Sequence, residues 1–375
     1  MIPLFKVFMS PAAGSAASDV LNSGFIGQGK KVDTFESMLG NYIGTDFINT
    51  TNSCTSALHL AFHLIKISNK LDHRDEVLAS PLTCTASNWP ILANDLNIKW
   101  VDINPNTMSM DLDDLERKIT KNTKAILIVH WGGSPVDLDR VKQIQAKTKQ
   151  IYGFTPTVVE DCAHSFGSSY KGSKLGNHGN FACYSFQAIK HLTSIDGGTL
   201  ISPNLEYHQK ARLLRWYGID RETNKKDFRC EADVLDWGFK FHMNDVSAAV
   251  GIENLKLVQQ EVINKNQNNA LFYNEQLQDV PGVTLMENCD DRESAYWIYS
   301  ILVDNRDQFM KHMKEKGIVV SQVHERNDIH TCVRQFKTHL PTLDKYIGKL
   351  VCIPNGWWVS ETDRQFIVDS IKEGW

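Results

Sequence analysis

The sequence of 375 residues lacks the features that mark several large classes of protein. Its uninterrupted apolar runs are only a handful of residues long, which argues against a membrane-spanning helix. The opening stretch, MIPLFKVFMSPAAG, lacks the charged and then apolar layout of a signal peptide. These absences lead us to expect a cytoplasmic protein that is not inserted in a membrane.

Charge and cysteine are not concentrated anywhere along the chain. The formal net charge is −4, and no basic stripe suggests nucleic acid as a partner. The eight cysteines are scattered, without a C-x-x-C pair or a metal-type cluster. We therefore expect free, mostly buried thiols and no metal site. The sequence also contains no repeats and no low-complexity segments.

Short β-rich runs alternate with helical stretches over the first two thirds of the chain. Several runs are apolar throughout, which is typical of strands buried on both faces. Between them lie segments such as 56–67, where apolar residues recur at helical spacing. This alternation predicts an α/β fold with a mostly parallel sheet covered by helices. The runs expected as strands are 46–51, 76–80, 98–103, 125–130, 157–161, 181–186 and 199–202.

The pattern changes in the last third of the chain. One long helix is expected from Asn254 to about Leu277, and we interpret it as a connection between two domains. The segments after it predict a small α+β domain, with a strand, a helix and a strand at 296–303, 307–315 and 317–323. We therefore divide the chain into a large domain, 1–250, and the linking helix with the small domain, 251–375.

Two polar residues follow predicted strands where a ligand could lie. Lys190 stands between the run 181–186 and the pair Gly197 and Gly198. Because lysine is costly to bury, it either reaches solvent or is held near a group that needs an amine. Asp161 ends the run TVVED, and the carboxyl ends of parallel strands line the ligand crevice of open sheets. A carboxylate there could equally cap the next turn.

A third segment, NTTNSCTSALHLAFHL, leads from a strand through small hydroxylated residues directly into a helix. The free N–H groups of the first turn, near Cys54, Thr55 and Ser56, form an anion site suited to a phosphate. Taken alone, a plain Ser/Thr helix cap is the commoner explanation.

Together the three segments provide what pyridoxal phosphate needs in a fold of this kind. The lysine forms the Schiff base, the carboxylate pairs with the pyridinium nitrogen, and the helix N-terminus holds the phosphate. An ionised Asp161 keeps the ring nitrogen protonated, so the ring can accept electrons. Lys190, displaced by an incoming amine, becomes a base that carries a proton between carbons. The combination predicts a pyridoxal phosphate enzyme.

The sequence also resembles a known family, the DegT/StrS-type nucleotide-sugar aminotransferases, which are fold-type I pyridoxal phosphate enzymes. The matching stretches, in the family's order, are SGFIGQGKKVDTFE, TNSCTSALHLA, SPLTCTASN, VEDCAHSFGS, YSFQAIKHLTSIDGGTL, GFKFHMNDVSAAVG and VHERNDIH. They cover nearly the whole chain. The resemblance implies a homodimer in which each active site is built from both chains.

The resemblance assigns roles to individual residues. Lys190 falls on the Schiff-base lysine and Asp161 on the pyridinium partner, while His164 matches a position near the cofactor's phenolic oxygen. The residues implied in cofactor binding are Cys54, Thr55, Asp161, His164, Ser185, Lys190 and Lys240. The residues implied in substrate binding are Phe25, Ile26, Arg215, Trp216, Tyr217, His324 and His330. For the stretch RWYGIDR, an ordinary packed loop is an equal alternative to binding of a nucleotide base and diphosphate.

The sequence departs from the family's pattern at four positions. Cys54 stands where many relatives have glycine, and Cys84 where an aromatic residue often lies near the cofactor ring. Lys240 stands where asparagine commonly reaches the neighbouring chain's cofactor phosphate, and His242 replaces a frequent arginine. We expect Lys240 to contact the partner's cofactor phosphate or the substrate diphosphate; the alternative is a solvent-facing lysine.

Two other motifs are interpreted as structural. GFIGQG is not preceded by a clear strand and opens no helix, as a dinucleotide fingerprint requires, so NAD binding is not expected. His59 and His63 have metal-like spacing, but the glutamate of a zinc protease motif is absent, and a helix surface explains them better.

The leading functional prediction is an aminotransferase. It is expected to move an amino group from glutamate to a nucleotide-linked keto-sugar. The favoured substrate is a 4-keto-6-deoxy sugar, and the product is an amino sugar for surface glycans. A 3-keto substrate is an alternative within the family. A second alternative is a sugar dehydratase, which has histidine in place of the lysine, and Lys190 argues against it. A third is a non-catalytic relative, against which the retained lysine, aspartate and phosphate segment argue together.

Overall fold

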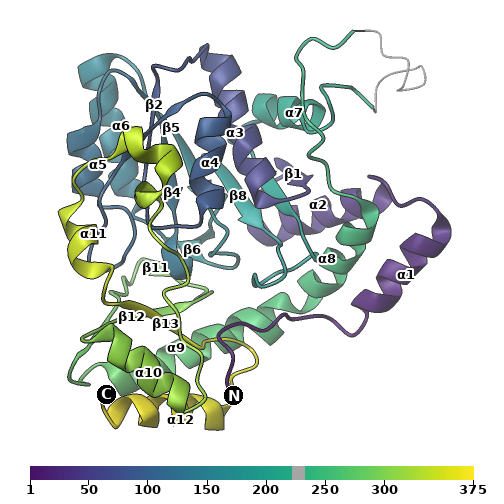
Figure 1. The fold of residues 1–375 in the computed structure, drawn as a ribbon. Coiled ribbons are helices and arrows are strands. Elements are labelled where there is room, and N and C mark those ends of the chain that lie inside the picture. The colour runs from purple at the N-terminus through teal and green to yellow at the C-terminus, as the bar shows by residue number, and fades with distance from the viewer. Residues whose placement is uncertain (222–232) are drawn as a thin grey trace.

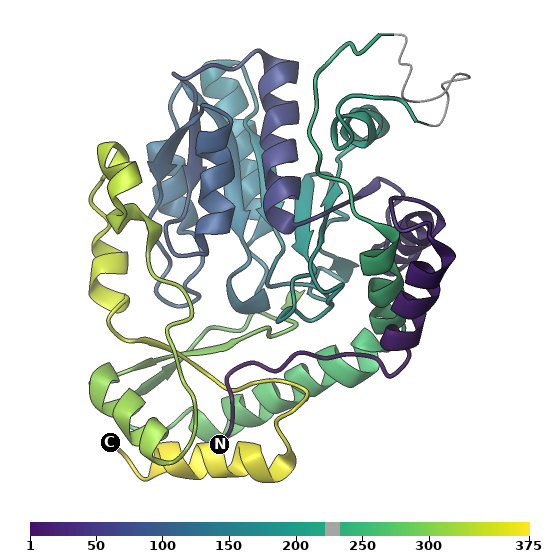
Figure 2. The ribbon, with the colours of Figure 1, turned by 45° about the vertical axis from the view of Figure 1, so that its right-hand side comes forward.

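The computed structural model describes residues 1–221 and 233–375. Figure 1 shows a larger α/β body above and a smaller body below, with both chain termini at the smaller one. A long helical segment runs between them, and the N-terminal segment crosses from the small body to the large one (Figure 2). Within the described residues, no helix is both long and apolar enough to cross a membrane.

The large body is built on one twisted sheet, which has seven strands within the described residues. Their spatial order is β1 (Ile48–Thr51), β9 (Gly198–Ile201), β8 (Phe181–Ser185), β5 (Thr157–Asp161), β4 (Thr123–Val129), β2 (Glu76–Ala79) and β3 (Asn97–Trp100). Neighbours are parallel except for the two antiparallel pairs that β9 makes with β1 and β8. The predicted mostly parallel sheet is therefore confirmed, and each predicted run overlaps one of these strands.

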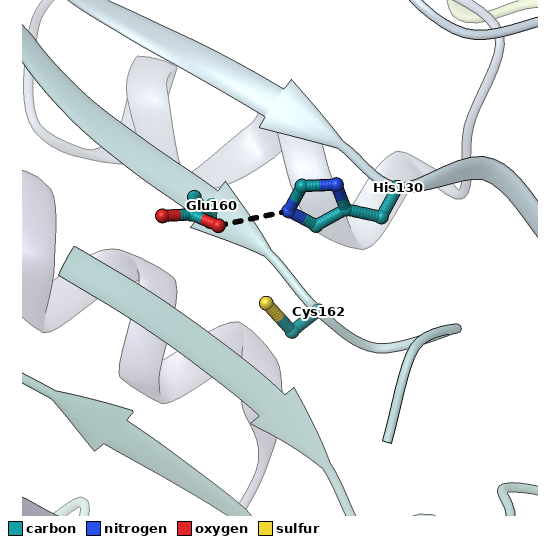
Figure 3. Close-up of side chains that lie close together, drawn as sticks. All are labelled: His130, Glu160 and Cys162. Carbon is teal, nitrogen blue, oxygen red and sulfur yellow. Dashed lines mark hydrogen bonds and ion pairs between the residues drawn. The ribbon is translucent and has the colours of Figure 1, made fainter. Parts of the chain in front are cut away.

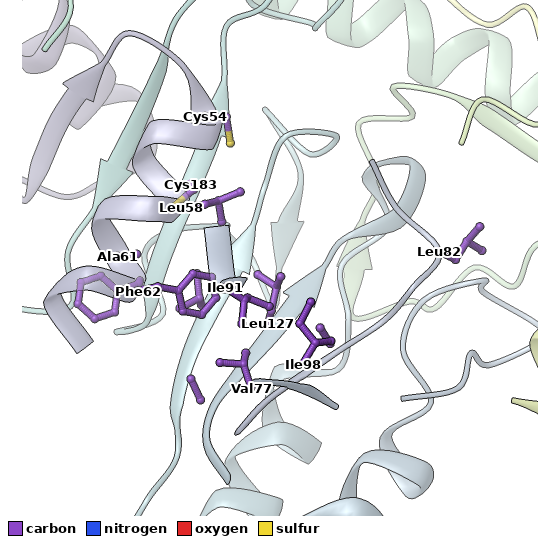
Figure 4. Close-up of a cluster of buried hydrophobic side chains, with 14 of the residues drawn as sticks. Cys54, Leu58, Ala61, Phe62, Val77, Leu82, Ile91, Ile98, Leu127 and Cys183 are labelled. Carbon is purple, nitrogen blue, oxygen red and sulfur yellow. The ribbon is translucent and has the colours of Figure 1, made fainter. Parts of the chain in front are cut away.

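Helices cover both faces of this sheet. The helices of the large body are α2 (Lys30–Ile43), α3 (Cys54–Asn69), α4 (Thr85–Ala93), α5 (Leu112–Lys118), α6 (Leu138–Tyr152), α7 (Leu205–Leu214) and α8 (Asp245–Val258), and α1 (Ala13–Ser23) packs against α8. The α3 helix begins where the Ser53 hydroxyl accepts a hydrogen bond from the Ser56 backbone N–H at 3.1 Å. Its apolar side packs on the sheet, and Figure 4 shows Leu58 and Phe62 in one cluster of buried side chains with Val77 of β2. This packing fixes the start of α3 at the edge of the sheet.

The linking helix begins earlier than its apolar pattern predicts. It starts at Asp245 with α8, passes through a π-helical turn, Gln259–Ile263, and continues as α9 (Asn264–Leu277). The Asn244 side chain accepts from the Ser247 backbone N–H at 2.9 Å and so caps the start. Because α8 packs against α1 and α2, this part of the helix belongs structurally with the large body.

The small body contains a second sheet, β10 (Val283–Leu285), β12 (Tyr299–Val303) and β13 (Leu350–Ile353), with α10 (Arg306–Glu315) and α12 (Glu361–Lys372) packed around it. The remaining elements are β6 (Ser169–Tyr170), β7 (Ser173–Lys174) and β11 (Arg292–Glu293), which form a short sheet, α11 (Pro341–Tyr346), and the short turns Trp131–Gly133, Asn327–Ile329 and Thr331–Phe336.

One predicted strand of the small body is wrong. The segment 317–323 makes only isolated bridges, at Ile318 with Ile2 and at Ser321 with Cys352. The backbone of Val323 has a φ of 68°, which a β-branched residue rarely adopts and which ends any continued pairing. The strand that pairs with β12 in its place is β13.

The division into 1–250 and 251–375 stays a prediction. The core of the small body draws on residues from Ala270 to Ile371, as that division expects. However, Val333 and Leu343 of the C-terminal part pack into the core of the large body.

Candidate active site

A cavity of about 490 Å³ opens at the carboxyl ends of β5 and β8. Side chains from α3, α4, β5 and the β8–β9 loop line one part of it, and Trp297 and residues 321–324 line another. Its volume is in the range typical of small-molecule sites. Among the candidate residues, the cavity is lined by Cys54, Thr55, Asp161, His164, Ser185, Lys190 and His324.

Asp161 is the last residue of β5, and its carboxylate is held by two hydrogen bonds. It accepts from the Ser87 hydroxyl at 2.6 Å and from the Ala163 backbone N–H at 3.0 Å. Burial raises the pKa of Asp161, and nearby Lys190 partly opposes that shift. A cationic ring nitrogen placed against this carboxylate would favour its ionised form.

Lys190 lies in the loop between β8 and β9. Its Nζ stands 3.4 Å from the centre of the Trp297 ring. Burial lowers the pKa of Lys190 to about 8, while Asp161 acts in the opposite direction. The neutral fraction of the amine near neutral pH is therefore larger than that of an exposed lysine, and the neutral form is the nucleophile toward an aldehyde.

The start of α3 and the end of β8 meet across β9. In the β9 ladders, Gly198 pairs with Thr51 on one side and with Ser185 on the other. A Cβ on Gly198 would stand 2.4 Å from the backbone nitrogen of Cys54, so only glycine allows this approach. The N–H groups of the first turn of α3 lack partners within the helix, and the Ser185 hydroxyl lies beside the same cavity.

Two histidines from different bodies face each other in the cavity. The Nε2 atoms of His164 and His324 are 3.4 Å apart, and the rings stack at 5.4 Å. Burial lowers the pKa of His164 well below its usual value and that of His324 to about 4, so both rings are neutral at pH 7. The buried Nδ1 of His164 has no hydrogen-bond partner within the described residues. It is free to meet a polar atom of a bound molecule.

This donor set fits pyridoxal phosphate. A buried carboxylate, a primary amine with a lowered pKa, and a helix N-terminus beside a serine hydroxyl converge on a cavity large enough for the group. The buried and unpartnered Nδ1 of His164 gives it one further polar contact.

Ser87, Trp297 and Phe5 are among the residues that line this cavity and that sequence reasoning missed. Ser87 lies within SPLTCTASN, a stretch that carries the family resemblance. A polar residue in such a stretch could have been predicted to lie near the cofactor. Trp297 and Phe5 lie in segments far from Lys190 in the chain, and their position results from tertiary packing alone.

Three candidate residues lie away from the cavity at exposed positions. Phe25 is 85% exposed and Ile26 is 50% exposed. Lys240 is exposed as well, and its backbone carbonyl accepts from the Asn52 side chain at 3.2 Å. Within one chain these residues do not reach the cavity, and their roles stay predictions that require the second chain.

The stretch RWYGIDR also lies outside the cavity. Arg215 is buried and forms an ion pair with Glu36, and it donates to the Thr50 carbonyl at 2.8 Å. The structure therefore favours the packed-loop interpretation for Arg215. Trp216 contacts His242 edge to face, with the ring centres 3.7 Å apart, and Tyr217 is partly exposed.

His330, the last of the candidates, packs against a tryptophan outside the cavity lining. Its ring contacts Trp89 edge to face, with the ring centres 5.8 Å apart. Its predicted contact with the substrate stays untested.

The structure corrects two statements about motifs interpreted as structural. A helix, α2, does open directly after GFIGQG, but the preceding element is the helix α1, and Asp245 already accepts from the N–H groups of Gly29, Lys31 and Val32. This N-terminus therefore cannot hold a dinucleotide phosphate. The expected surface position is wrong for His63, which is buried and packs against Trp237.

A buried cluster of His130, Glu160 and Cys162 lies near the site, with ligand atoms within 4.8 Å of one another (Figure 3). His130 Nε2 is 3.0 Å from Glu160, and its Nδ1 accepts from the Val136 backbone N–H at 3.1 Å. Because both ring nitrogens are already used, we interpret the cluster as a structural hydrogen-bond network that ties the loop after β4 to β5. Among the cysteines, Cys230 lies outside the described residues, and the others form no disulfide.

Comparisons with known proteins agree with this geometry. The model of the DegT/DnrJ/EryC1/StrS aminotransferase family matches residues 11–372. A transaminase of Campylobacter jejuni, UDP-4-amino-4,6-dideoxy-N-acetyl-beta-L-altrosamine transaminase, is 30% identical over 95% of this chain and 93% of its own length.

Two solved structures match the whole chain. The sugar aminotransferase CalS13 from Micromonospora echinospora has a TM-score of 0.96 and 43% identity, covering 100% of both chains. AtS13 from Actinomadura melliaura has a TM-score of 0.96 and 46% identity, covering 100% of this chain and 99% of its own. The chain therefore belongs to the DegT/DnrJ/EryC1/StrS aminotransferase family and is a pyridoxal phosphate-dependent transaminase of fold-type I.

Proposed function

We propose that this transaminase moves an amino group from L-glutamate to a 4-keto-6-deoxy sugar carried on a nucleoside diphosphate, in the synthesis of an amino sugar. The observation that carries the proposal is the convergence of Lys190, Asp161 and the start of α3 on one cavity. This cavity is large enough to admit a sugar beside the cofactor.

The choice of carbon 4 rests on two supports. The Campylobacter jejuni relative, 30% identical, is named for a sugar with its amine at position 4. The stretches SGFIGQG and VHERNDIH also resemble the enzymes of the family that act at this carbon. Amination at carbon 3 is the competing outcome of the experiment below.

In this proposal each residue has a separate task. The cofactor, when bound, supplies an electron sink for the pair left at the substrate carbon that loses its proton. Asp161 faces the ring nitrogen and keeps it protonated, and Ser87 and the Ala163 N–H hold the carboxylate in place. Lys190 accepts the proton at Nζ and returns it to the neighbouring carbon.

The remaining polar groups orient the cofactor. The N–H groups of Cys54 and Thr55 and the Ser185 hydroxyl bind its phosphate, with the positive end of the α3 dipole behind them. His164 offers its free Nδ1 to the phenolic oxygen. Both histidines are neutral at pH 7. They therefore orient the cofactor by hydrogen bonds and add no charge that would weaken the pairing of Asp161 with the cationic ring.

We also propose a homodimer whose active sites are shared. The exposed positions of Phe25 and Ile26 support this, because large apolar side chains that gather at the surface are expected at an interface, and Lys240 is exposed as well. In the dimer these residues would reach the partner's cavity and contact the nucleotide-sugar or the cofactor phosphate.

The test is a product assay. Purified protein is incubated with L-glutamate and a panel of nucleotide-linked 3-keto and 4-keto-6-deoxy sugars, and NMR locates the new amine. An amine at carbon 4 supports the proposal, and an amine at carbon 3 replaces it with the competing substrate. Loss of the oxygen without amination contradicts transamination, and Lys190→Ala serves as the inactive control.

A further inference from the structure

Trp297 lies where the small body meets the β8–β9 loop. Its side chain is only 4% exposed, and its indole N–H donates to the carbonyl of Ile189 at 2.8 Å. Ile189 directly precedes Lys190, so this hydrogen bond ties the backbone of the lysine to a residue more than a hundred positions away in the chain. Trp297 therefore restrains the backbone from which the Lys190 side chain extends.

The same indole also contacts the end of that side chain. Nζ of Lys190 stands 3.4 Å from the ring centre, which is well within the range of a cation–π contact. The electron-rich face of an indole attracts an ammonium more strongly than it attracts a neutral amine. Trp297 thus holds the lysine at both ends.

The ring of Trp297 is itself held on several sides. His164 stacks on it at 4.1 Å, and Phe5 of the N-terminal segment stacks on it at 5.2 Å. That segment is fixed in turn, because the indole N–H of Trp358 donates to the Pro3 carbonyl at 2.9 Å. A ring packed in this way offers Lys190 a preformed surface.

We propose that Trp297 is a positioning residue for Lys190, and that its indole face is the resting place of the lysine amine whenever that amine is not bonded to the cofactor. The inference rests on the proposed function, in which Lys190 is the lysine that bonds the cofactor. An incoming donor amine displaces Lys190, which must then stay within reach of the carbons that exchange the proton. A free lysine side chain with four rotatable bonds has no such restraint.

Other groups around Lys190 also affect its ionisation. Those that favour the ammonium are Asp161, Cys54 and Cys84. The histidines that face it are His164, His324 and His191. Burial acts against the ammonium more strongly than any of these acts for it. Since the indole face adds to the favourable side, its removal should lower the pKa of Lys190 further.

The experiment measures this pKa directly. The full-length enzyme is loaded with pyridoxamine phosphate, which leaves every lysine free, and is labelled with acetic anhydride at a series of pH values. Mass spectrometry of the peptide that contains Lys190 gives the midpoint of its reactivity. We expect Trp297→Leu to lower that midpoint by about 0.4 to 1.5 units relative to the parent enzyme. Trp297→Phe keeps an aromatic face and should lower it less.

The matched control is Trp89→Leu, which removes a tryptophan that packs against His330 and does not line the cavity. Its midpoint should equal that of the parent enzyme. Equal midpoints in the parent and in a folded Trp297→Leu protein overturn the inference, as does an equal fall in the control. Trp297→Met removes the aromatic face with less loss of volume and replaces the leucine variant if that one does not fold.

A second measurement separates this inference from the proposed function. Borohydride reduction of the enzyme loaded with pyridoxal phosphate identifies the lysine that bonds the cofactor. If that lysine is another one, the proposed assignment of Lys190 fails. If it is Lys190 while the midpoints do not move, only the role of Trp297 fails.

Discussion

At the scale of single residues, the site depends on two ionisable groups whose pKa values have moved toward each other. Burial lowers the pKa of Lys190 and raises that of Asp161, so both charged forms are disfavoured in the empty cavity. A bound cofactor removes the first difficulty by bonding the amine and the second by presenting a cation. Burial of these two groups in the cavity therefore costs less free energy when the cofactor is bound than when it is not.

Lys190 should be the residue that bonds the cofactor. Purified protein should be yellow, and borohydride should fix the cofactor to the peptide that contains Lys190. Lys190→Ala should lose both the fixed cofactor and the activity. A reducible imine on a different lysine in Lys190→Ala would show that the assignment is wrong.

The Asp161→Asn substitution should lower turnover without destabilising the folded protein. Removing one member of a buried charge pair costs about 3–5 kcal/mol, so turnover should fall by roughly a hundredfold to a few thousandfold. Near-normal turnover would refute the electron-sink role.

The same substitution should not lower the melting temperature of the cofactor-free protein. Because burial raises the pKa of Asp161 above its unfolded value, the ionised carboxylate disfavours the folded state at neutral pH. Asparagine relieves that cost and still bonds Ser87 and the Ala163 N–H. A clear fall in the melting temperature would instead assign Asp161 a structural role.

At the scale of elements, the phosphate end of the site depends on β9 lying against the start of α3. This contact has no space for a side chain at Gly198, because an added Cβ would meet the Cys54 nitrogen at 2.4 Å. Gly198, the first residue of β9, therefore explains part of the sequence after Lys190, because the backbone there approaches the start of α3 too closely for a side chain.

Gly198→Ala should weaken cofactor binding. The clash must push the first turn of α3 away from Ser185, at a cost of about 1–3 kcal/mol, which corresponds to roughly a five- to hundredfold higher dissociation constant for pyridoxal phosphate. Titration of the cofactor-free protein, followed by absorbance, measures it. The control is Gly348→Ala, where an added Cβ meets nothing within 4 Å. Equal affinity in the two variants would contradict the role given to Gly198.

At the scale of the whole molecule, the site joins parts of the chain that lie far apart in the sequence. His324 and Trp297 come from the C-terminal part of the chain, while Lys190, Asp161 and His164 come from the large sheet. We propose that the exposed candidate residues extend this pattern to a second chain, because none of them lines the cavity of its own chain.

Lys240 should act on the partner's site. We expect Lys240→Ala to lose most activity, because a cation that faces a phosphate is removed. Mixing Lys190→Ala chains with Lys240→Ala chains should partly restore activity, since one site of each mixed dimer keeps both side chains. The charge control is Lys265→Ala, which removes an exposed lysine at the start of α9 that pairs with Glu261 of the preceding π-helical turn.

Two outcomes would count against this role for Lys240. Full activity of the Lys240→Ala variant alone would show that the lysine is not needed to bind the phosphate. An inactive variant that mixing fails to rescue, after chain exchange is proven, would place the residue in its own chain's site or in the fold.

The sequence by itself determined the order of strands and helices and the chemistry at their ends. Apolar runs such as 125–129 of β4 and 181–183 of β8 predict strands buried on both faces because no polar side chain interrupts them. Lys190, Asp161 and the hydroxyl-rich start of α3 follow such runs, and parallel strands bring their carboxyl ends to one edge. Local pattern and this one geometric rule are enough to predict that part of the site.

Only the tertiary structure decided which distant side chains complete the site. The segment 317–323 has the apolar pattern of a strand, yet the chain turns at Val323 and delivers His324 to His164. Likewise nothing in the sequence around Trp297 indicates that its ring lies on Lys190. Such contacts depend on how segments far apart in the chain pack together, and a pattern within one segment carries no information about the surface that it meets.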